Sequence, residues 1–306
     1  RNNAIIRKLV AVETLGSTTV ICSDKTGTLT LNQMTVGRLF CDNRIVEVTG
    51  SGYDPQGEFR ENNNNLSVPL EDAFQKLFTA AALCNNASLV KKENNYEIIG
   101  DPTEGALVTV AEKAEIQKDD AEKNSPRIDE IAFESEKQYM AVLNRADNKN
   151  ILWLKGSPER VISMCGKIFT SGKISGFTED QKDKISKVNE DFAKKAMRVI
   201  AAAFNEYPSD TKKIDEDSLP GSLIFLGLFG MIDPPRDEAV KAISQCQDAG
   251  MKVVMVTGDN KITAKAIADQ LGLSTGKALS GSELSKLSTE DLHSQIEDIS
   301  VFARIE

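Results

Sequence analysis

The sequence contains few of the residues that build metal centres, disulfide frameworks and membrane spans. Its one histidine, His293, lies in a polar stretch and cannot form a metal site alone, so we expect it at the surface. Its five cysteines are scattered and include no C-x-x-C pair, which favours reduced thiols in a cytosolic setting over disulfides or zinc. The longest apolar run, residues 222–232, is shorter than the about 20 residues of a transmembrane helix. The cysteines are Cys22, Cys41, Cys84, Cys165 and Cys246.

Positive charge is also in deficit. The 37 Lys and Arg residues stand against 46 Asp and Glu, which gives a net charge of −9. This balance argues against nucleic acid and against an anionic membrane surface as binding partners. The apolar content of 40% and the charged content of 27% are typical of a soluble globular protein. With 306 residues the chain is long enough for two domains, and we expect it to be monomeric.

The apolar run of residues 19–22 leads to Asp24, and Lys-Thr-Gly-Thr-Leu-Thr follows at once. This pattern predicts a buried strand that places a carboxylate at its carboxyl end, where open parallel sheets bind ligands. An aspartate in that position can attack phosphorus and form an aspartyl phosphate. Thr26 and Gly27 offer hydroxyl and amide groups that suit a phosphoryl group. For Asp24 taken alone, capping of a turn is the simpler interpretation.

A second buried-strand pattern, residues 251–257, ends in Thr257-Gly258-Asp259 and precedes a helical run over 261–271. Thr257 and the Gly258 amide are expected to hold phosphoryl oxygens beside Asp24. Asp259 is expected to cap the following helix, to contribute to the site, or to do both. More than two hundred residues separate the two strand ends, which predicts an inserted second domain.

The inserted segment mixes helices with consecutive strands, which predicts an antiparallel sheet with helices packed on it. We therefore expect an α/β protein with a discontinuous parallel-sheet domain at 1–36 and 226–306 and an inserted α+β domain at 37–225. A short helix is expected within 1–17, and the polar stretch 61–65 is expected to be a solvated loop. The helices expected in the insert are 70–84, 102–115, 158–164 and 178–197, and the strands are 130–134, 139–146, 150–156 and 199–204.

The string from Asp24 to Thr30 resembles the phosphorylation signature of the P-type ATPases, the ATP-driven cation pumps. The resemblance implies that Asp24 is phosphorylated, that Asp24 and Thr26 bind Mg²⁺, and that the parallel-sheet domain is Rossmann-like. Asp24 with Thr257 also resembles the haloacid-dehalogenase superfamily, whose phosphatases mostly carry a second acid two residues after the nucleophile. Thr26 stands there, and a threonine cannot act as a general base at neutral pH. The phosphoenzyme should therefore persist, which favours a pump over a soluble phosphatase with a large cap domain.

Four segments of the insert resemble the nucleotide site of the same family. They imply an adenine pocket lined by Lys155 and Gly156, an aromatic platform at Phe133, and a carboxylate for the base at Glu104 beside Thr103. They also imply a phosphate-directed cation at Arg198. Taken singly, Phe133 suits a core position, Glu104 a helix N-terminus and Arg198 a solvated surface. Their joint presence in family order favours ATP binding, and a non-catalytic nucleotide-binding module is a third possibility.

Two further residues resemble the family, and the sequence departs from the family's pattern in two places. Many relatives have lysine where Gln138 stands, so we expect weaker nucleotide binding. Asp233, in Asp-Pro-Pro-Arg, resembles mainly the hinge between domains, and the resemblance also places it among the nucleotide-site residues. Arg304 resembles a residue that contacts the nucleotide from the phosphorylation domain. The family's catalytic set also includes a lysine that contacts the phosphoryl group and a Gly-Asp-Gly-x-Asn-Asp segment that supplies a second magnesium ligand. We find no counterpart of either in this sequence.

The resemblance implies ATP and Mg²⁺ as cofactors, and a place at the cytoplasmic face of a membrane. The transported cation would pass through helices that this sequence lacks, so we expect a soluble piece that binds ATP without efficient turnover and has an incomplete parallel sheet. Segments 12–17 and 30–34 look like the calcium and sodium–potassium branch, and calcium is favoured.

Overall fold

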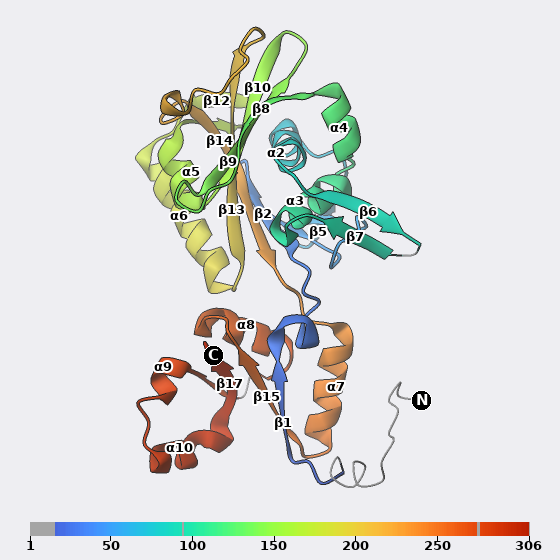
Figure 1. Cartoon of the computed structure of the whole chain (residues 1–306), viewed down its shortest axis with the longest axis vertical. Coiled ribbons are helices and arrows are strands. Elements are labelled where there is room, and N and C mark those ends of the chain that lie inside the picture. The colour runs from blue at the N-terminus through green and yellow to red at the C-terminus, as the bar shows by residue number, and fades with distance from the viewer. Residues whose placement is uncertain (1–15, 94, 274–275, 306) are drawn as a thin grey trace. The chain divides into compact units, whose positions relative to one another are not determined.

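The chain folds as two units and crosses between them twice (Figure 1). The computed structural model describes residues 16–93, 95–273 and 276–305. One unit, here called the parallel unit, comprises 1–32 and 234–306, and the other, the antiparallel unit, comprises 33–233. The helix expected within 1–17 falls almost wholly outside the described residues. No helix within the described ranges is long and apolar enough to cross a bilayer.

The parallel unit contains a four-stranded sheet in the order β1-β15-β17-β16, with all neighbouring strands parallel. Helix α7 packs against β15, and α8 packs against β16 and β17. Asn260 begins α8, because its side chain accepts hydrogen bonds from the Ile262 and Thr263 amides. The elements are β1 (Val20–Asp24), α7 (Asp237–Asp248), β15 (Lys252–Thr257), α8 (Lys261–Gln270), β16 (Lys277–Ser280), α9 (Gly281–Leu284), α10 (Thr289–Gln295) and β17 (Ile299–Ala303).

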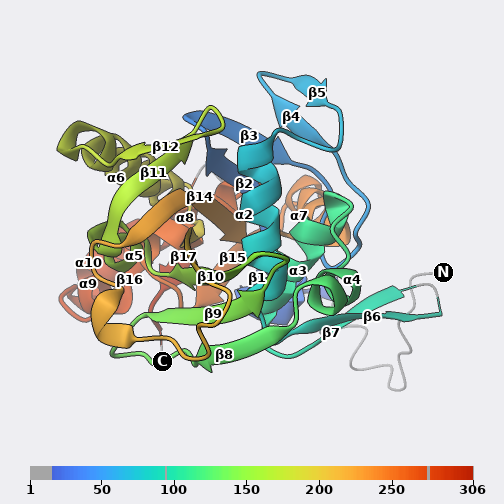
Figure 2. The same ribbon diagram turned by 90° about the horizontal axis from the view of Figure 1, so that it is seen from above.

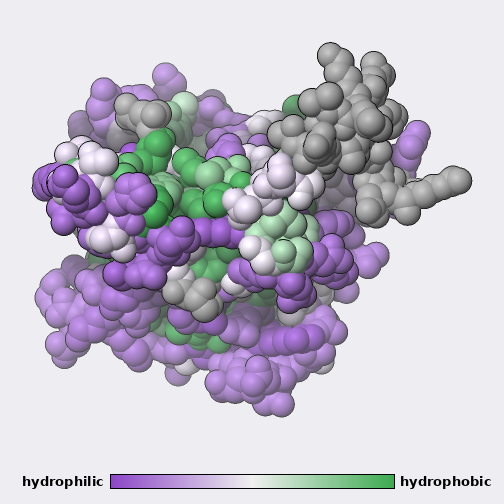
Figure 3. Space-filling model, turned by 90° about the horizontal axis from the view of Figure 1, so that it is seen from below, coloured by the Kyte–Doolittle hydropathy of each residue, from purple (hydrophilic) through white to green (hydrophobic). Residues whose placement is uncertain are grey.

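The prediction that the strand before Asp24 is buried is wrong for the described residues. Strand β1 alternates between exposed and half-buried positions, and 49% of Val20 is exposed. The reason is its place at one end of the described sheet, where it pairs with β15 alone. Strand β15 has the expected buried character at Val253, Val254 and Met255. Figure 3, which views the molecule from below, shows hydrophobic residues exposed between hydrophilic ones.

The antiparallel unit is built on a sheet of eleven strands. Nine follow the order β5-β4-β3-β2-β14-β13-β10-β9-β8, while β11 pairs with β14 in parallel and β12 pairs with β11. The strands are β2 (Thr35–Cys41), β3 (Arg44–Val48), β4 (Phe59–Glu61), β5 (Asn64–Leu66), β8 (Arg127–Ile131), β9 (Tyr139–Arg145), β10 (Lys149–Gly156), β11 (Cys165–Thr170), β12 (Lys173–Gly176), β13 (Arg198–Pro208) and β14 (Leu223–Ile232).

Helices cover both faces of this sheet (Figure 2). Helices α2 (Asp72–Leu83), α3 (Pro102–Lys113) and α4 (Lys118–Asn124) lie on one side, where the hairpin of β6 (Ser88–Lys92) and β7 (Asn95–Ile99) contacts α3. Helices α5 (Pro158–Met164) and α6 (Glu179–Lys194) lie on the other side. The structure therefore confirms a mixed α/β protein with one parallel sheet and one large, mostly antiparallel sheet.

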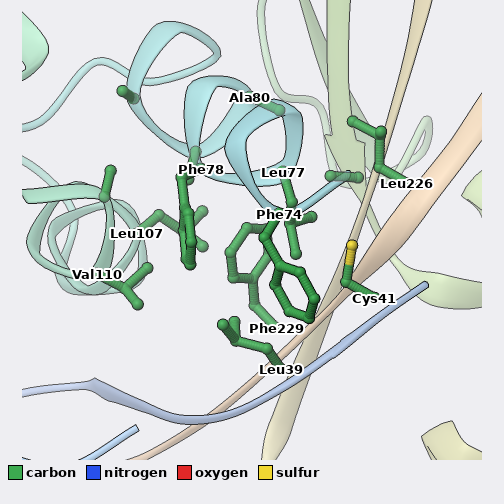
Figure 4. Packing of buried hydrophobic residues seen from close by; sticks show 14 of the residues in the cluster. Leu39, Cys41, Phe74, Leu77, Phe78, Ala80, Leu107, Val110, Leu226 and Phe229 are labelled. Carbon is green, nitrogen blue, oxygen red and sulfur yellow. The ribbon is translucent and has the colours of Figure 1, made fainter. Parts of the chain in front are cut away.

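Each face of the large sheet has its own hydrophobic core. On the α2 side, Phe74, Leu77 and Phe78 pack toward Leu39 and Phe229 of the sheet (Figure 4). The opposite core takes the alternate residues of the same strands, such as Ala141, Leu143, Leu152 and Leu154. Because both faces are covered, the central strands read as continuous apolar runs without an alternating pattern.

The unit boundaries differ from the predicted ones at both crossings. The contacts divide the chain after Asn32 and after Asp233, whereas the sequence suggested residues 36 and 225. Strands β2 and β14 are antiparallel neighbours, with Ile232 opposite Thr35, and this pairing keeps both strands in the antiparallel unit.

The polar stretch 61–65, expected as a loop, lies in the β4–β5 hairpin. Asn62 and Asn63 have positive φ angles of 49° and 66°, which suit the two central residues of a tight hairpin turn. The five cysteines are free thiols and His293 is exposed, as predicted.

Candidate functional site

A cavity of about 410 Å³ opens in the antiparallel unit, a size within the range of small-molecule sites. Its walls come from the start of α3, the segment after β8, the end of β10 and the start of β13. Leu107, Met140 and Ile200 give it apolar surface, and Asn86 and Asp101 add polar groups. Six residues singled out in the sequence line it together: Thr103, Glu104, Phe133, Lys155, Gly156 and Arg198.

The start of α3 places Thr103 and Glu104 at the cavity. The Asp101 carboxylate caps this helix by accepting hydrogen bonds from the Thr103 and Glu104 amides, at 2.8 and 3.2 Å. Pro102 occupies the first helical turn, where its missing N–H group costs nothing. The Asp-Pro-Thr-Glu string is thus a helix start that fixes the backbone of its acidic residue.

Glu104 and Lys155 form an ion pair in the cavity wall, with Nζ 2.6 Å from Oε1. Their side chains are only 18% and 11% exposed, so the pair is shielded from water on most sides. The second carboxylate oxygen of Glu104 accepts a hydrogen bond from the Asn86 N–H group at 3.2 Å. Charge-assisted contacts on both oxygens hold the carboxylate in one orientation.

Gly156 is required where β10 ends beside the turn before β9. A Cβ atom at this position would lie 2.4 Å from the Gln138 carbonyl oxygen, which is backbone and cannot turn away. The Gln138 side chain accepts a hydrogen bond from the Ser157 hydroxyl at 3.1 Å, and Gln138 is not among the residues that line the cavity. Lys137, its neighbour, forms ion pairs with Glu134 and Glu216, so it too is engaged outside the cavity.

The turn after Phe133 is anchored through Glu216. The Tyr139 hydroxyl donates a 2.6 Å hydrogen bond to Glu216, and this bond is the main reason that the pKa of Glu216 is lowered. Burial, helped by the same bond, raises the pKa of Tyr139 to about 12. Phe133 itself is 57% exposed at the cavity. An exposed aromatic ring there offers a flat face for a planar ligand.

In the parallel unit, Asp24 lies at the carboxyl end of β1, opposite Val256 of β15. Asp24 is exposed, and no hydrogen bond or ion pair from another described residue reaches its carboxylate. Thr26 and Gly27 follow in a tight turn in which Gly27 has φ +72°. The turn leaves the carboxylate open to an incoming ligand.

Thr257 and Asp259 are neighbours at the end of β15. The Thr257 hydroxyl accepts a hydrogen bond from the Asp259 N–H group at 3.1 Å, and the Asp259 carboxylate lies 2.9 Å from Lys25 Nζ. The expectation that Asp259 caps the following helix is wrong, since Asn260 has that role. Gly258 is exposed between them.

Arg236, a residue that no sequence motif indicated, organises the turn after Asp24. Its side chain donates to the carbonyl oxygens of Thr30 and Gly27 at 3.0 and 3.2 Å, and its own N–H group donates to Leu29. The Asp-Pro-Pro-Arg string was interpreted mainly as a hinge, and no local signal marks this contact, because Arg236 and Gly27 lie 209 positions apart in the sequence.

Two residues predicted to contact a nucleotide do not line the cavity. Asp233 accepts a hydrogen bond from the Gln33 N–H group at 3.2 Å, which joins the two segments that cross between the units. Arg304 lies in the parallel unit after β17, and its N–H group donates to the Asp259 carbonyl oxygen at 3.0 Å.

The donor set at Asp24 suits magnesium only with a phosphorylated ligand. No group of three or more His, Cys, Asp or Glu residues able to hold a metal occurs in the described part of the chain. Mg²⁺ needs only one or two carboxylates when substrate phosphates and water complete its shell. Asp24 with Thr26 therefore fits Mg²⁺ that arrives with a phosphate.

Known proteins similar to this chain include calcium- and cation-transporting ATPases. A family model described as P-type ATPase, cytoplasmic domain N, matches residues 73–238. The whole chain is 40% identical to a calcium-transporting ATPase of Bacillus subtilis and 41% identical to the cation-transporting ATPase pma1 of Synechocystis, and covers 34% of each. A probable cation-transporting ATPase F of Mycobacterium tuberculosis is 38% identical, also over the whole chain. The chain spans about one third of the length of these relatives.

Proposed function

The chain belongs to the P-type ATPase family, and we propose that it binds ATP in the antiparallel unit and accepts the γ-phosphoryl group on Asp24. The observation that carries this proposal is the convergence of four distant segments on one cavity. An aromatic face, a fixed carboxylate, a lysine and an arginine meet there, from residues that span almost one hundred positions of sequence. This is the chemistry that a purine, its amino group and a phosphate chain require.

Each lining residue has a defined part in this proposal. Phe133 stacks on the base, and Glu104 accepts a hydrogen bond from its amino group. Lys155 holds Glu104 and borders the base, while Gly156 lets the ligand approach the backbone. Arg198, exposed at the start of β13, is the cation for the phosphates.

The chemical step is an in-line displacement on phosphorus. A carboxylate oxygen of Asp24 bonds to the γ-phosphorus as the bond from that phosphorus to the bridging oxygen breaks, which gives an aspartyl phosphate and ADP. The Thr257 hydroxyl and the Gly258 amide donate hydrogen bonds to the phosphoryl oxygens. Bound Mg²⁺, held by Asp24 and Thr26, supplies neutralising charge. Because Thr26 cannot act as a general base, the aspartyl phosphate is protected from hydrolysis.

The finer assignments follow from the same reasoning. The parallel unit is proposed to be a Rossmann-like, haloacid-dehalogenase-type phosphorylation domain, and the whole protein an ATP-driven cation pump at the cytoplasmic face of a membrane. Calcium is the proposed ion, since one of the three relatives named here is a calcium-transporting ATPase and the other two are cation-transporting ATPases. A soluble phosphatase with a large cap domain is the alternative. It is disfavoured because Thr26 occupies the position where most such phosphatases carry a second acid.

Titration with a fluorescent ATP analogue tests the nucleotide site. We expect Phe133→Ala and Lys155→Ala each to weaken binding about 10-fold or more, because each removes a stacking or charge-assisted contact. Lys149→Ala is the matched control, since Lys149 lies at the other end of β10 in an exposed pair with Glu206. Absence of binding to the unmodified chain, or equal binding by all variants, would refute the proposed site.

Incubation with a generic phosphate ester separates pump from phosphatase. The pump proposal predicts no sustained release of phosphate. Rapid release that disappears in Asp24→Asn would instead establish the phosphatase alternative.

A further inference from the structure

The loop that follows α2, residues 84–87, is held rigidly beside the cavity. Asn85 is fully buried, and its side-chain amide donates to the carbonyl oxygens of Ala81 and Glu104, both at 2.9 Å. The buried Lys118 donates to the Asn85 and Ala87 carbonyl oxygens at 3.1 and 2.6 Å. A loop fixed by a buried cationic side chain and a buried amide has few alternative conformations.

Arg127, at the start of β8, fixes both this loop and the side chain of Asn86. Its Nη2 donates to the Asn85 carbonyl oxygen at 2.8 Å, and its Nη1 donates to Asn86 Oδ1 at 2.6 Å. Glu130 forms an ion pair with the same guanidinium. Because arginine can only donate, the Asn86 oxygen must face it, and the remaining group of that amide is the donor Nδ2.

Asn86 therefore adds a hydrogen-bond donor to a cavity wall that already holds an acceptor. Asn86 and Glu104 both line the cavity, and the Asn86 backbone N–H group binds the Glu104 carboxylate, so the two residues are neighbours in its wall. No hydrogen bond from Asn86 Nδ2 to another residue is found in the described ranges. A donor beside an acceptor matches adenine, which presents an amino group next to an unprotonated ring nitrogen.

We propose that Asn86 is a base-specificity residue, that it donates to an adenine ring nitrogen beside the amino group bound by Glu104, and that Arg127 is its positioning residue. This inference rests on the proposed function, since it requires an adenine nucleotide in the cavity. Guanine and hypoxanthine carry a carbonyl oxygen in place of the amino group. They would therefore place an acceptor against the Glu104 carboxylate and could not form the two hydrogen bonds with Glu104 and Asn86 together.

The test is a comparison of unlabelled nucleotides by calorimetry, with ATP, 1-deaza-ATP and 7-deaza-ATP. Each analogue lacks one ring nitrogen next to the amino edge. The unmodified chain should prefer ATP to one of the two analogues by about 2- to 10-fold, the value of one hydrogen bond. In Asn86→Ala that preference should vanish, and in Arg127→Lys it should shrink, because the amide is no longer pinned.

Asn86→Asp keeps the shape and the contact with Arg127 but removes the donor, so it should bind ATP more weakly than Asn86→Ala while folding normally by circular dichroism. Lys149→Ala should keep the full preference. An unchanged preference in Asn86→Ala, or no preference in the unmodified chain, would overturn the role of Asn86 while ATP binding stands. Failure of the unmodified chain to bind ATP would instead refute the proposed function.

Discussion

The cavity of the antiparallel unit and the strand tip of the parallel unit differ in how completely the described residues build them. Around the cavity, Glu104 is held on both oxygens and its neighbours are tied to a buried loop. At the strand tip, Asp24 is exposed on a strand with one described neighbour. The proposed nucleotide site is therefore preorganised within one unit, while Asp24, the proposed nucleophile, is held mainly by its backbone turn.

The largest predicted difference between the units concerns packing. Phe78→Ala should lower the free energy of unfolding of the antiparallel unit by about 3–5 kcal/mol, since its ring is fully buried against Phe59. Val20→Ala in the half-exposed β1 should cost well under about 1 kcal/mol. Urea unfolding followed by circular dichroism measures both. Equal losses would contradict the contrast between a packed core and an edge strand.

The second prediction concerns the buried ion pair. Glu104→Gln should weaken ATP binding by about 1.5–3 kcal/mol, because it removes a charged acceptor and leaves Lys155 without its partner. Glu206→Gln breaks the exposed Lys149 pair on the neighbouring strand and should leave affinity unchanged. Calorimetric titration with ATP distinguishes them, and similar affinities for the two variants would show that the cavity pair has no special part.

The third prediction concerns pH. Burial raises the pKa of the Cys84 thiol from 9.0 to about 11, so above pH 9 the unfolded chain releases this proton while the folded chain keeps it. Stability should therefore fall with rising pH between about 9 and 11, by about 1.4 kcal/mol per pH unit from this group. Urea unfolding at pH 8 and pH 10 should show a steeper loss in the unmodified chain than in Cys84→Ala. Cys22→Ala, at an exposed position, is the control, and parallel slopes for all three would disprove the effect.

The smallest predicted effect separates two helix caps. Asp101→Ala and Asn260→Ala should each cost about 1 kcal/mol of stability, because each removes a side-chain acceptor from two backbone amides. Only Asp101→Ala should also weaken ATP binding, since its helix start positions Glu104. Thermal unfolding and calorimetry on the same samples measure the two effects. Loss of affinity in Asn260→Ala but not in Asp101→Ala would reverse the comparison.

Six of the residues that the family resemblance implied for a nucleotide site line one cavity, and their role there stays a prediction. The resemblance was needed, because Phe133, Glu104 and Arg198 each have a simpler interpretation when taken alone. Local signals account only for the backbone around them. Asp101-Pro102 starts a helix, Gly156 ends a strand, and both place their neighbours without long-range information.

Asn86 and Arg127 were missed because their contact joins polar residues forty-one positions apart, and no periodicity marks such a pair. The exposure of β1 was missed because burial of a strand depends on its neighbours in the sheet, which the strand's own residues do not specify.

The central claim is that one preorganised cavity in the antiparallel unit binds ATP. Photolabelling with 8-azido-ATP, followed by peptide mapping, tests it most directly. We expect label within residues 132–140 or 154–157 that excess ATP removes and that is strongly reduced in Lys155→Ala. Label that excess ATP does not remove, or ATP-sensitive label confined to peptides of the parallel unit, would contradict it.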